Sequence, residues 1–132
     1  MSTIFTKIVN GEIPSYKVAE NDKFYAFLDI SPLAEGHTLV IPKAQIDYIF
    51  DIPEEDYKEF FSFAKKIALS IHKNFPCKKV GMAVIGLEVP HAHIHLVPIN
   101  EVNGIDFSRP KLKLSDDRFK EIAQVISQNI KG

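Results

Sequence analysis

The spacing of apolar and polar residues predicts four β-strands along the chain. Residues 23–30 (KFYAFLDI) and 37–41 (HTLVI) are short apolar runs, and each is bounded by turn-forming residues. Residues 80–85 (VGMAVI) have the same character. The fourth run, residues 91–97 (HAHIHLV), alternates between histidine and apolar residues up to its last position. Such alternation is typical of a strand whose two faces differ.

The alternating run would place its two kinds of residue on opposite faces of a sheet. One face carries His91, His93 and His95, and the other carries apolar side chains that can pack into a core. Histidine titrates near neutral pH, so it can act as a nucleophile, an acid, a base or a metal ligand. Three of the five histidines of the chain lie in this run, so we expect the run to hold the functional site.

Two longer segments have the period of an α-helix. Pro53 is followed by three acidic residues, which suits a helix start, and apolar residues then recur at helical spacing until Asn74 and Pro76. Ser115 is followed by two aspartates, which suits the N-cap of a second helix over about residues 115–130. The apolar stripe of this second helix is Phe119, Ile122, Ala123, Ile126 and Ile130.

The order of these elements favours an α+β fold. Strands lie on both sides of the long helix, and neighbouring strands are separated by gaps of hairpin length. We therefore expect a mainly antiparallel sheet of about five strands, with one long helix packed on it and an added C-terminal helix. Residues 1–132 would form a single domain, with a core over 1–100 and a C-terminal extension over 101–132. Within the extension, residues 105–114 have no clear periodicity.

Composition and charge narrow the possible functions. The chain has 132 residues, of which 45% are hydrophobic and 25% are charged, as in ordinary soluble domains. Its formal net charge of -1 gives no basic field that would attract nucleic acid. The single cysteine cannot form an internal disulfide, and the N-terminus lacks the apolar run of a signal peptide. No window approaches the about 20 apolar residues of a membrane span. We expect a cytoplasmic protein with no nucleic-acid or membrane partner.

A metal site is one chemistry that such histidines allow. Zinc binds imidazole nitrogen at about 2.0–2.1 Å. On a strand that rises about 3.3 Å per residue, His91 and His95 start about 13 Å apart, so three rings cannot easily meet one ion. A zinc site would combine two of the three histidines with a ligand from elsewhere, such as His37 or Asp29.

Nucleophilic catalysis at phosphorus suits the row of histidines better. A neutral imidazole attacks phosphorus well, and the middle histidine can do so while its neighbours bind phosphate oxygens or donate a proton. The sequence has no GxxxxGK[ST] loop to hold a phosphate, so imidazoles and backbone N–H groups would have to bind it. A purely structural histidine cluster is the remaining alternative.

The segment from His91 to Val97 resembles the signature of the histidine triad (HIT) family, His-φ-His-φ-His-φ-φ with φ apolar, at every position. Three further segments are similar, in the same order, to blocks of small HIT hydrolases: residues 3–14 (TIFTKIVNGEIP), 26–32 (AFLDISP) and 37–43 (HTLVIPK). The resemblance implies the HIT fold and a homodimer. It also implies hydrolysis or transfer at the α-phosphate of a purine nucleotide, with no cofactor and no metal.

The resemblance further implies roles for individual residues. His93 aligns with the nucleophile that forms a covalent nucleotidyl-histidine, and His95 with the histidine that contacts the phosphate and assists the leaving group. His91 and His37 align with histidines that complete and orient the phosphate end, and Asp29 with the acid that binds the ribose hydroxyls. The apolar pocket for the base would be formed by Ile4, Phe5, Ile8, Phe27 and Ile30.

The segment before the triad departs from the family pattern. Many relatives carry Gly-Gln-Ser/Thr-Val there, preceded by an asparagine, whereas residues 86–89 of this chain read GLEV and no asparagine lies between residues 79 and 91. Gly86, Leu87 and Glu88 are still expected to line the nucleotide site. Two polar phosphate contacts are then absent or come from other residues, and Glu88 would repel a phosphate if it pointed inward. A nucleotide-binding or partner-binding module with little turnover is the alternative that this departure leaves open.

Overall fold

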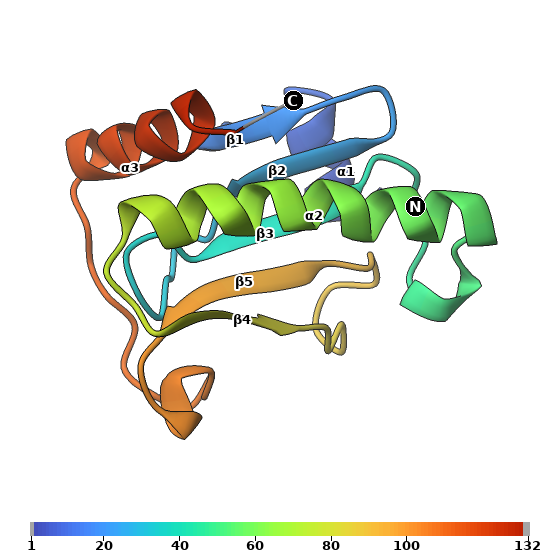
Figure 1. Ribbon diagram of the computed structural model, residues 1–132. Helices are drawn as coiled ribbons and strands as arrows, with labels where there is room; N and C mark the ends of the chain where they lie inside the picture. The colour runs from blue at the N-terminus through green and yellow to red at the C-terminus, as the bar shows by residue number, and fades with distance from the viewer. Residues whose placement is uncertain (1, 131–132) are drawn as a thin grey trace.

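The computed structural model describes residues 2–130 and contains a five-stranded antiparallel sheet (Figure 1). The strands lie in the order β1-β2-β3-β5-β4, and every neighbouring pair is antiparallel. Their bounds are β1 Lys17–Glu20, β2 Phe24–Leu28, β3 Thr38–Pro42, β4 Lys79–Ala83 and β5 Ile94–Ile99. The predicted α+β class is confirmed. The strand that the sequence pattern missed is β1, because four residues are too few to reveal a period.

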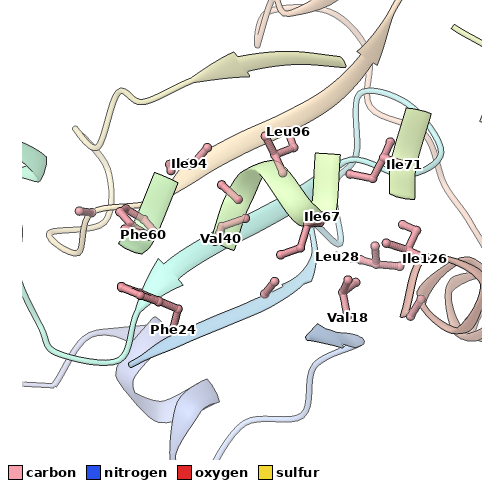
Figure 2. Close-up of a cluster of buried hydrophobic side chains, with 14 of the residues drawn as sticks. Val18, Phe24, Leu28, Val40, Phe60, Ile67, Ile71, Ile94, Leu96 and Ile126 are labelled. Carbon is pink, nitrogen blue, oxygen red and sulfur yellow. The ribbon is translucent and has the colours of Figure 1, made fainter. Parts of the chain in front are cut away.

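The long helix α2, Glu54–Asn74, covers one face of the sheet (Figure 1). It begins directly after Pro53, as predicted, and three acidic residues occupy its first turn, where carboxylates favour the helix dipole. Its apolar side shares one core with the strands below it, as Figure 2 shows. Completely buried members of this core include Phe60, Ile67 and Ile71 of the helix and Val40 and Ile94 of the sheet.

The added C-terminal helix α3, Asp116–Gln128, is confirmed over a slightly shorter range than expected. The side chain of Ser115 caps it by accepting a hydrogen bond from the backbone N–H of Arg118 at 3.0 Å. Ser70 of α2 donates to the carbonyl oxygen of Ile126 at 2.6 Å, so the two helices are joined at a buried position. The apolar side of α3 therefore belongs to the main core.

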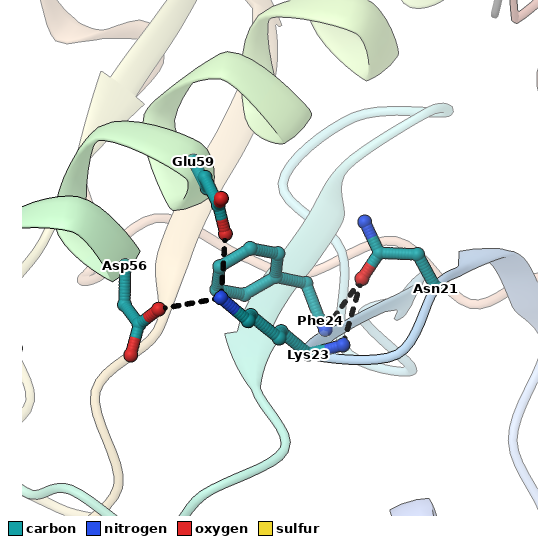
Figure 3. Close-up of polar contacts among 5 residues, drawn as sticks. All are labelled: Asn21, Lys23, Phe24, Asp56 and Glu59. Carbon is teal, nitrogen blue, oxygen red and sulfur yellow. Dashed lines mark hydrogen bonds and ion pairs between the residues drawn. The ribbon is translucent and has the colours of Figure 1, made fainter.

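The β1–β2 hairpin is tied to the start of α2 by polar contacts (Figure 3). The side-chain oxygen of Asn21 accepts hydrogen bonds from the backbone N–H groups of Lys23 and Phe24, which closes the turn. Nζ of Lys23 then lies 2.9 Å from Asp56 and 3.0 Å from Glu59. Exposed ion pairs contribute little to stability because water screens them, so these contacts orient the hairpin more than they stabilise the fold.

A short helix on the opposite face of the sheet was not predicted. Helix α1 spans Ile4–Val9 and has no acidic residue in its first turn, so the sequence gives neither a long period nor a charge signal for it. Alternate residues of β2 point to opposite faces. Ala26 joins the core under α2, whereas Phe27 packs with Phe5 and Ile8 of α1. Helix α1 therefore forms an apolar wall on the second face.

The predicted strand over residues 91–97 was wrong at its start. The strand β5 begins only at the fourth residue of this run. The N–H of His91 bonds to the carbonyl of Val89 at 2.8 Å, and that of Ala92 to the carbonyl of Ile46 at 2.7 Å, so the chain bends here. The apolar residues of the run nevertheless lie in the main core, as expected: Ala92, Ile94 and Leu96.

An irregular segment connects β5 to α3. It begins with the short 3-10 helix η2, Val102–Gly104, and continues through residues 105–114 without helix or strand. The N–H of Leu112 donates to the carbonyl oxygen of Pro32 at 2.9 Å, which holds the segment beside the loop that follows β2. A second 3-10 helix, η1 at Ile49–Asp51, precedes α2. No helix within residues 2–130 is long and apolar enough to cross a membrane.

Candidate active site

A cleft of about 610 Å³ lies on the α1 side of the sheet. It is bounded by α1, the end of β2, residues 85–89 and part of the segment 105–114. All predicted site residues line it except His37 and His91, which lie behind its wall. Another cleft, of about 700 Å³ between β1 and α3, contains no histidine. The smaller cleft is therefore the candidate active site.

His93 presents a fixed lone pair to the cleft. Its Nδ1 lies 2.8 Å from the carbonyl oxygen of His91, which can only accept, so Nδ1 carries the hydrogen. In the neutral ring, Nε2 then keeps its lone pair, and it has no hydrogen-bond partner within residues 2–130. The ring of Phe5 packs edge-on against that of His93, with centroids 5.0 Å apart. Orientation and tautomer are therefore both set before any ligand binds.

His91 is a completely buried scaffold residue whose two ring nitrogens are both used. Nε2 donates to the carbonyl oxygen of Pro42 at 2.7 Å, and Nδ1 accepts from the hydroxyl of Thr3 at 2.9 Å. Burial lowers the pKa of His91, which favours this neutral form. Neither nitrogen can reach a ligand in the cleft. His91 instead fixes the backbone carbonyl that orients His93.

Thr3, Thr6 and Gln45 support His91, and the sequence did not reveal them as part of the site. Thr3 caps α1, since its hydroxyl oxygen accepts from the N–H of Thr6 at 3.1 Å. The Gln45 side-chain oxygen accepts from the N–H of Thr3 at 3.2 Å and from the hydroxyl of Thr6 at 2.9 Å. The start of α1, the loop after β3 and the triad are thereby joined. An N-cap threonine was the one readable signal.

A chain of hydrogen bonds fixes the tautomers of His37 and His95. The N–H of Leu33 donates to Nδ1 of His37 at 3.0 Å, so neutral His37 carries its hydrogen on Nε2. That Nε2 lies 3.0 Å from Nδ1 of His95, which accepts, and the hydrogen of His95 is then on its own Nε2. Burial lowers the pKa of His37 to about 3 and that of His95 to about 4, so both rings are neutral at neutral pH. His95 is therefore a donor toward the cleft.

Asp29 follows β2 and lies beside the His37–His95 pair. One carboxylate oxygen accepts from the N–H of Ser31 at 2.8 Å, and the other lies 3.5 Å from Nε2 of His37. Burial raises the pKa of Asp29, and the bond from Ser31 opposes this rise. Asp29, His37 and His95 each offer one ligand atom within 4.8 Å of the others. Two imidazoles and a carboxylate are a ligand set that zinc accepts.

The end of the cleft beyond His95 is closed by residues that the sequence did not single out. The ring of Phe107 lies 4.7 Å from that of His95. Nζ of Lys111 donates to the carbonyl oxygens of Phe107 and Arg109, the latter at 3.0 Å. Both side chains line the cleft, and Lys111 is the one lysine or arginine to do so in the described part of the chain. Irregular backbone gives no period from which this placement could have been read.

The segment before the triad forms the open side of the cleft. Gly86 has a φ of 71°, in the left-handed region that glycine adopts without strain. Leu87 is 90% exposed, and Glu88 is exposed at the cleft edge. These side chains line the cleft, but they bring no amide or hydroxyl to a phosphate.

Known proteins are similar to this chain over most of its length. The family model described as HIT domain matches residues 10–102. The chain is 35% identical to the adenosine 5'-monophosphoramidase hnt1 of Schizosaccharomyces pombe, across 99% of this chain and 100% of that protein. A Hit-like protein involved in cell-cycle regulation from Bartonella henselae, solved with an unknown ligand, is 32% identical with a TM-score of 0.84, over 97% of this chain and 96% of that one. A Zn-bound histidine triad family protein from Mycobacterium smegmatis is 27% identical with a TM-score of 0.81, over 98% of this chain and 94% of that one.

Proposed function

Because this chain belongs to the HIT domain family, we propose that it hydrolyses or transfers a purine nucleotide at its α-phosphate through a covalent intermediate on His93. One observation carries the proposal. The lone pair of His93 Nε2 and the N–H of His95 belong to rings 5.0 Å apart that line one cleft, and scaffold hydrogen bonds set both tautomers. The name of the fission yeast relative supports a nucleoside phosphoramidate as substrate.

The base would bind against the apolar wall of the cleft. Phe5 and Phe27 form a rigid floor there, with ring centroids 5.6 Å apart. Ile4 and Ile30 at the rim are 49% and 71% exposed, so a bound purine would remove apolar surface from water. Asp29, which directly follows β2, would accept hydrogen bonds from the ribose hydroxyls. Ile8 completes the apolar wall from α1.

In the first step, Nε2 of His93 would attack phosphorus and form a P–N bond while the bond from phosphorus to the leaving group breaks. The ring keeps its hydrogen on Nδ1, and the carbonyl of His91 stabilises the positive charge that develops there. The negative charge of the bound phosphate favours uptake of one further proton from solvent, so that both ring nitrogens of His95 carry a hydrogen. His95 would then pass the proton on Nε2 to the departing atom and become neutral again.

In the second step, water would attack the same phosphorus. The oxygen of water bonds to phosphorus and the P–N bond to His93 breaks. One proton of the water stays on this oxygen, and the other returns to Nε2 of His95. The products are a nucleoside monophosphate and the starting form of both rings. A nucleophile other than water would turn the same intermediate into a transfer reaction.

Incubation with adenosine 5'-phosphoramidate tests this function. We expect release of adenosine monophosphate and, after rapid quenching, an intact protein mass raised by one adenylyl group. His93→Ala should abolish both signals, while His72→Ala, which changes an exposed histidine on α2, should leave them unchanged. Turnover by His93→Ala at the wild-type rate would rule out the intermediate. Nucleotide binding without any product would favour a binding module, to which the exposed Leu87 and Glu88 also point.

Zinc binding is the second candidate function. It is favoured by the convergence of Asp29, His37 and His95, and by the zinc-bound relative from Mycobacterium smegmatis. Elemental analysis of protein purified without chelators would give one zinc per chain if this candidate is right. Asp29→Asn should then lower the zinc content, and metal-free protein with full hydrolase activity would exclude a role for zinc in the reaction.

We also propose that the protein acts as a cytoplasmic homodimer. Strand β4 is at the edge of the sheet, and its Met82 is 45% exposed, so a second copy could pair there. Light scattering at several concentrations would give twice the chain mass. A monomer at all concentrations would contradict this assembly.

A further inference from the structure

We propose that Phe107 and Lys111 form a subsite for an anionic leaving group, such as a second phosphate, a sulfate or a carboxylate. The inference rests on the proposed nucleotide chemistry and adds a substrate class to it. Both residues lie in the segment 105–114, beyond the part of the chain that the HIT domain matches. We call these two residues the cationic cap.

The cationic cap lies at the end of the cleft where the leaving group would depart. The imidazoles form a row between two phenylalanines, since Phe5 packs on His93 at 5.0 Å and Phe107 packs on His95 at 4.7 Å. The Phe5 end is apolar and suits the base. With His93 at the phosphorus and His95 as the proton donor, the leaving group would point toward Phe107.

The ammonium of Lys111 is held at this end by the fold of the segment. It donates to the carbonyl oxygens of Phe107 and Arg109, so it follows the backbone of the cap. The segment itself is anchored by the bond from the N–H of Leu112 to the carbonyl of Pro32.

The charges that line the cleft leave Lys111 as the group that can neutralise an anionic leaving group. The acidic residues that line the cleft are Asp29 and Glu88, and the loop before the triad offers no amide or hydroxyl side chain. A nucleotide with an anionic leaving group adds at least one further negative charge beyond the α-phosphate. Among the cleft-lining residues of the described chain, only Lys111 carries a fixed positive charge to meet it.

Calorimetric binding tests the cap independently of turnover. The ligands are adenosine monophosphate and α,β-methylene-ADP, which differ by one anionic group at the leaving-group position. Lys111→Met should weaken binding of α,β-methylene-ADP by about tenfold and that of the monophosphate by less than about twofold. Lys111→Arg should restore most of the affinity. Lys113→Met is the matched control, since Lys113 lies in the same segment but outside the cleft, and it should bind like wild type.

A kinetic comparison separates the cap from the proposed function. Adenosine 5'-phosphosulfate has an anionic leaving group, and adenosine 5'-phosphoramidate has a neutral amine. Lys111→Met should lower kcat/KM for the phosphosulfate about tenfold more than for the phosphoramidate. Equal losses on both substrates, or equal weakening of both ligands, would overturn the subsite. If wild type cleaves neither substrate, the proposed function fails, whereas the binding comparison still decides whether Lys111 recognises the added charge.

Discussion

The four histidines of the site form two pairs that differ in what surrounds the second ring nitrogen. His37 and His91 are almost fully inaccessible, at 1% and 0% exposed, and both nitrogens of each ring are bonded to the protein. His93 and His95 are only slightly more exposed, at 7% and 9%, yet each bonds to the protein through Nδ1 and keeps Nε2 for the cleft. Burial alone therefore does not separate the pairs. The position of the hydrogen-bond partners does.

Removing the proposed nucleophile should cause the largest loss of activity, and it tests the contrast between the two pairs most directly. We expect His93→Ala to lower kcat/KM for adenosine 5'-phosphoramidate by about 10⁴-fold or more, because no other ring nitrogen in the cleft has a free lone pair in its set tautomer. Steady-state kinetics with the phosphoramidate would measure this. His91→Ala should retain more activity than His93→Ala, and the reverse order would show that the two pairs have been assigned the wrong way round.

Removing the proposed donor should cost less, by an amount that depends on the leaving group. We expect His95→Ala to lower kcat/KM by about 10²-fold for substrates with a poor leaving group. The phenolate of an acidic phenol departs without a proton. For a nucleotide ester of such a phenol, His95→Ala should therefore lower kcat/KM much less. A series of esters of graded phenol acidity would measure the dependence. Equal losses across the series would mean that His95 binds phosphate but donates no proton.

The sequence predicted those parts of the fold whose signals lie close together in the chain. Helix α2 and strand β3 have long or clear apolar patterns, and both were found. Helix α1 and strand β1 were missed because six and four residues do not establish a period. The early bend before β5 was missed because it depends on a backbone bond from Ala92 to Ile46, far away in the sequence.

The candidate site shows the same division. A motif and its flanking segments pointed to His93, His95 and Asp29, and all three line the cleft. Which histidine faces the ligand could not be read from the chain, because the tautomers depend on distant partners. The bond that occupies His91 joins residues 88 positions apart. Lys111 was missed for a related reason, since an irregular segment carries no pattern that places its side chains.

Acid should expose the cost of keeping His37 and His95 neutral. Their folded pKa values, about 3 and about 4, lie below the value of 6.5 for an unperturbed histidine, so between these limits the unfolded chain binds more protons. Above pH 6.5 both rings are neutral in the folded and unfolded states, so stability does not depend on their protonation. As the pH falls from 6.5 toward the folded pKa values, the free energy of unfolding decreases. Each ring can contribute up to about 1.4 kcal/mol per pH unit in this window.

Urea unfolding at pH 7, 6 and 5 would measure this loss of stability. The raised pKa of Asp29 acts in the opposite direction, because its carboxyl holds a proton more readily in the folded state, and this should flatten the curve at the acid end. His37→Gln should reduce the slope between pH 7 and pH 5. A wild-type free energy of unfolding that is constant across this range would contradict the neutral assignment of both His37 and His95.

Thr3 allows the smallest and most selective perturbation, because among the four histidines of the site its hydroxyl bonds to His91. Thr3→Val removes the hydroxyl that caps α1 and that donates to Nδ1 of His91. We expect the free energy of unfolding to fall by about 1–2 kcal/mol, since an N-cap is lost and a buried ring nitrogen loses its partner. Thr3→Ser keeps the hydroxyl and should stay within about 0.5 kcal/mol of wild type. If His91 serves to hold the carbonyl that orients His93, Thr3→Val should also lower kcat while KM for the nucleotide changes little. A loss confined to KM would instead assign Thr3 to the α1 wall of the base pocket.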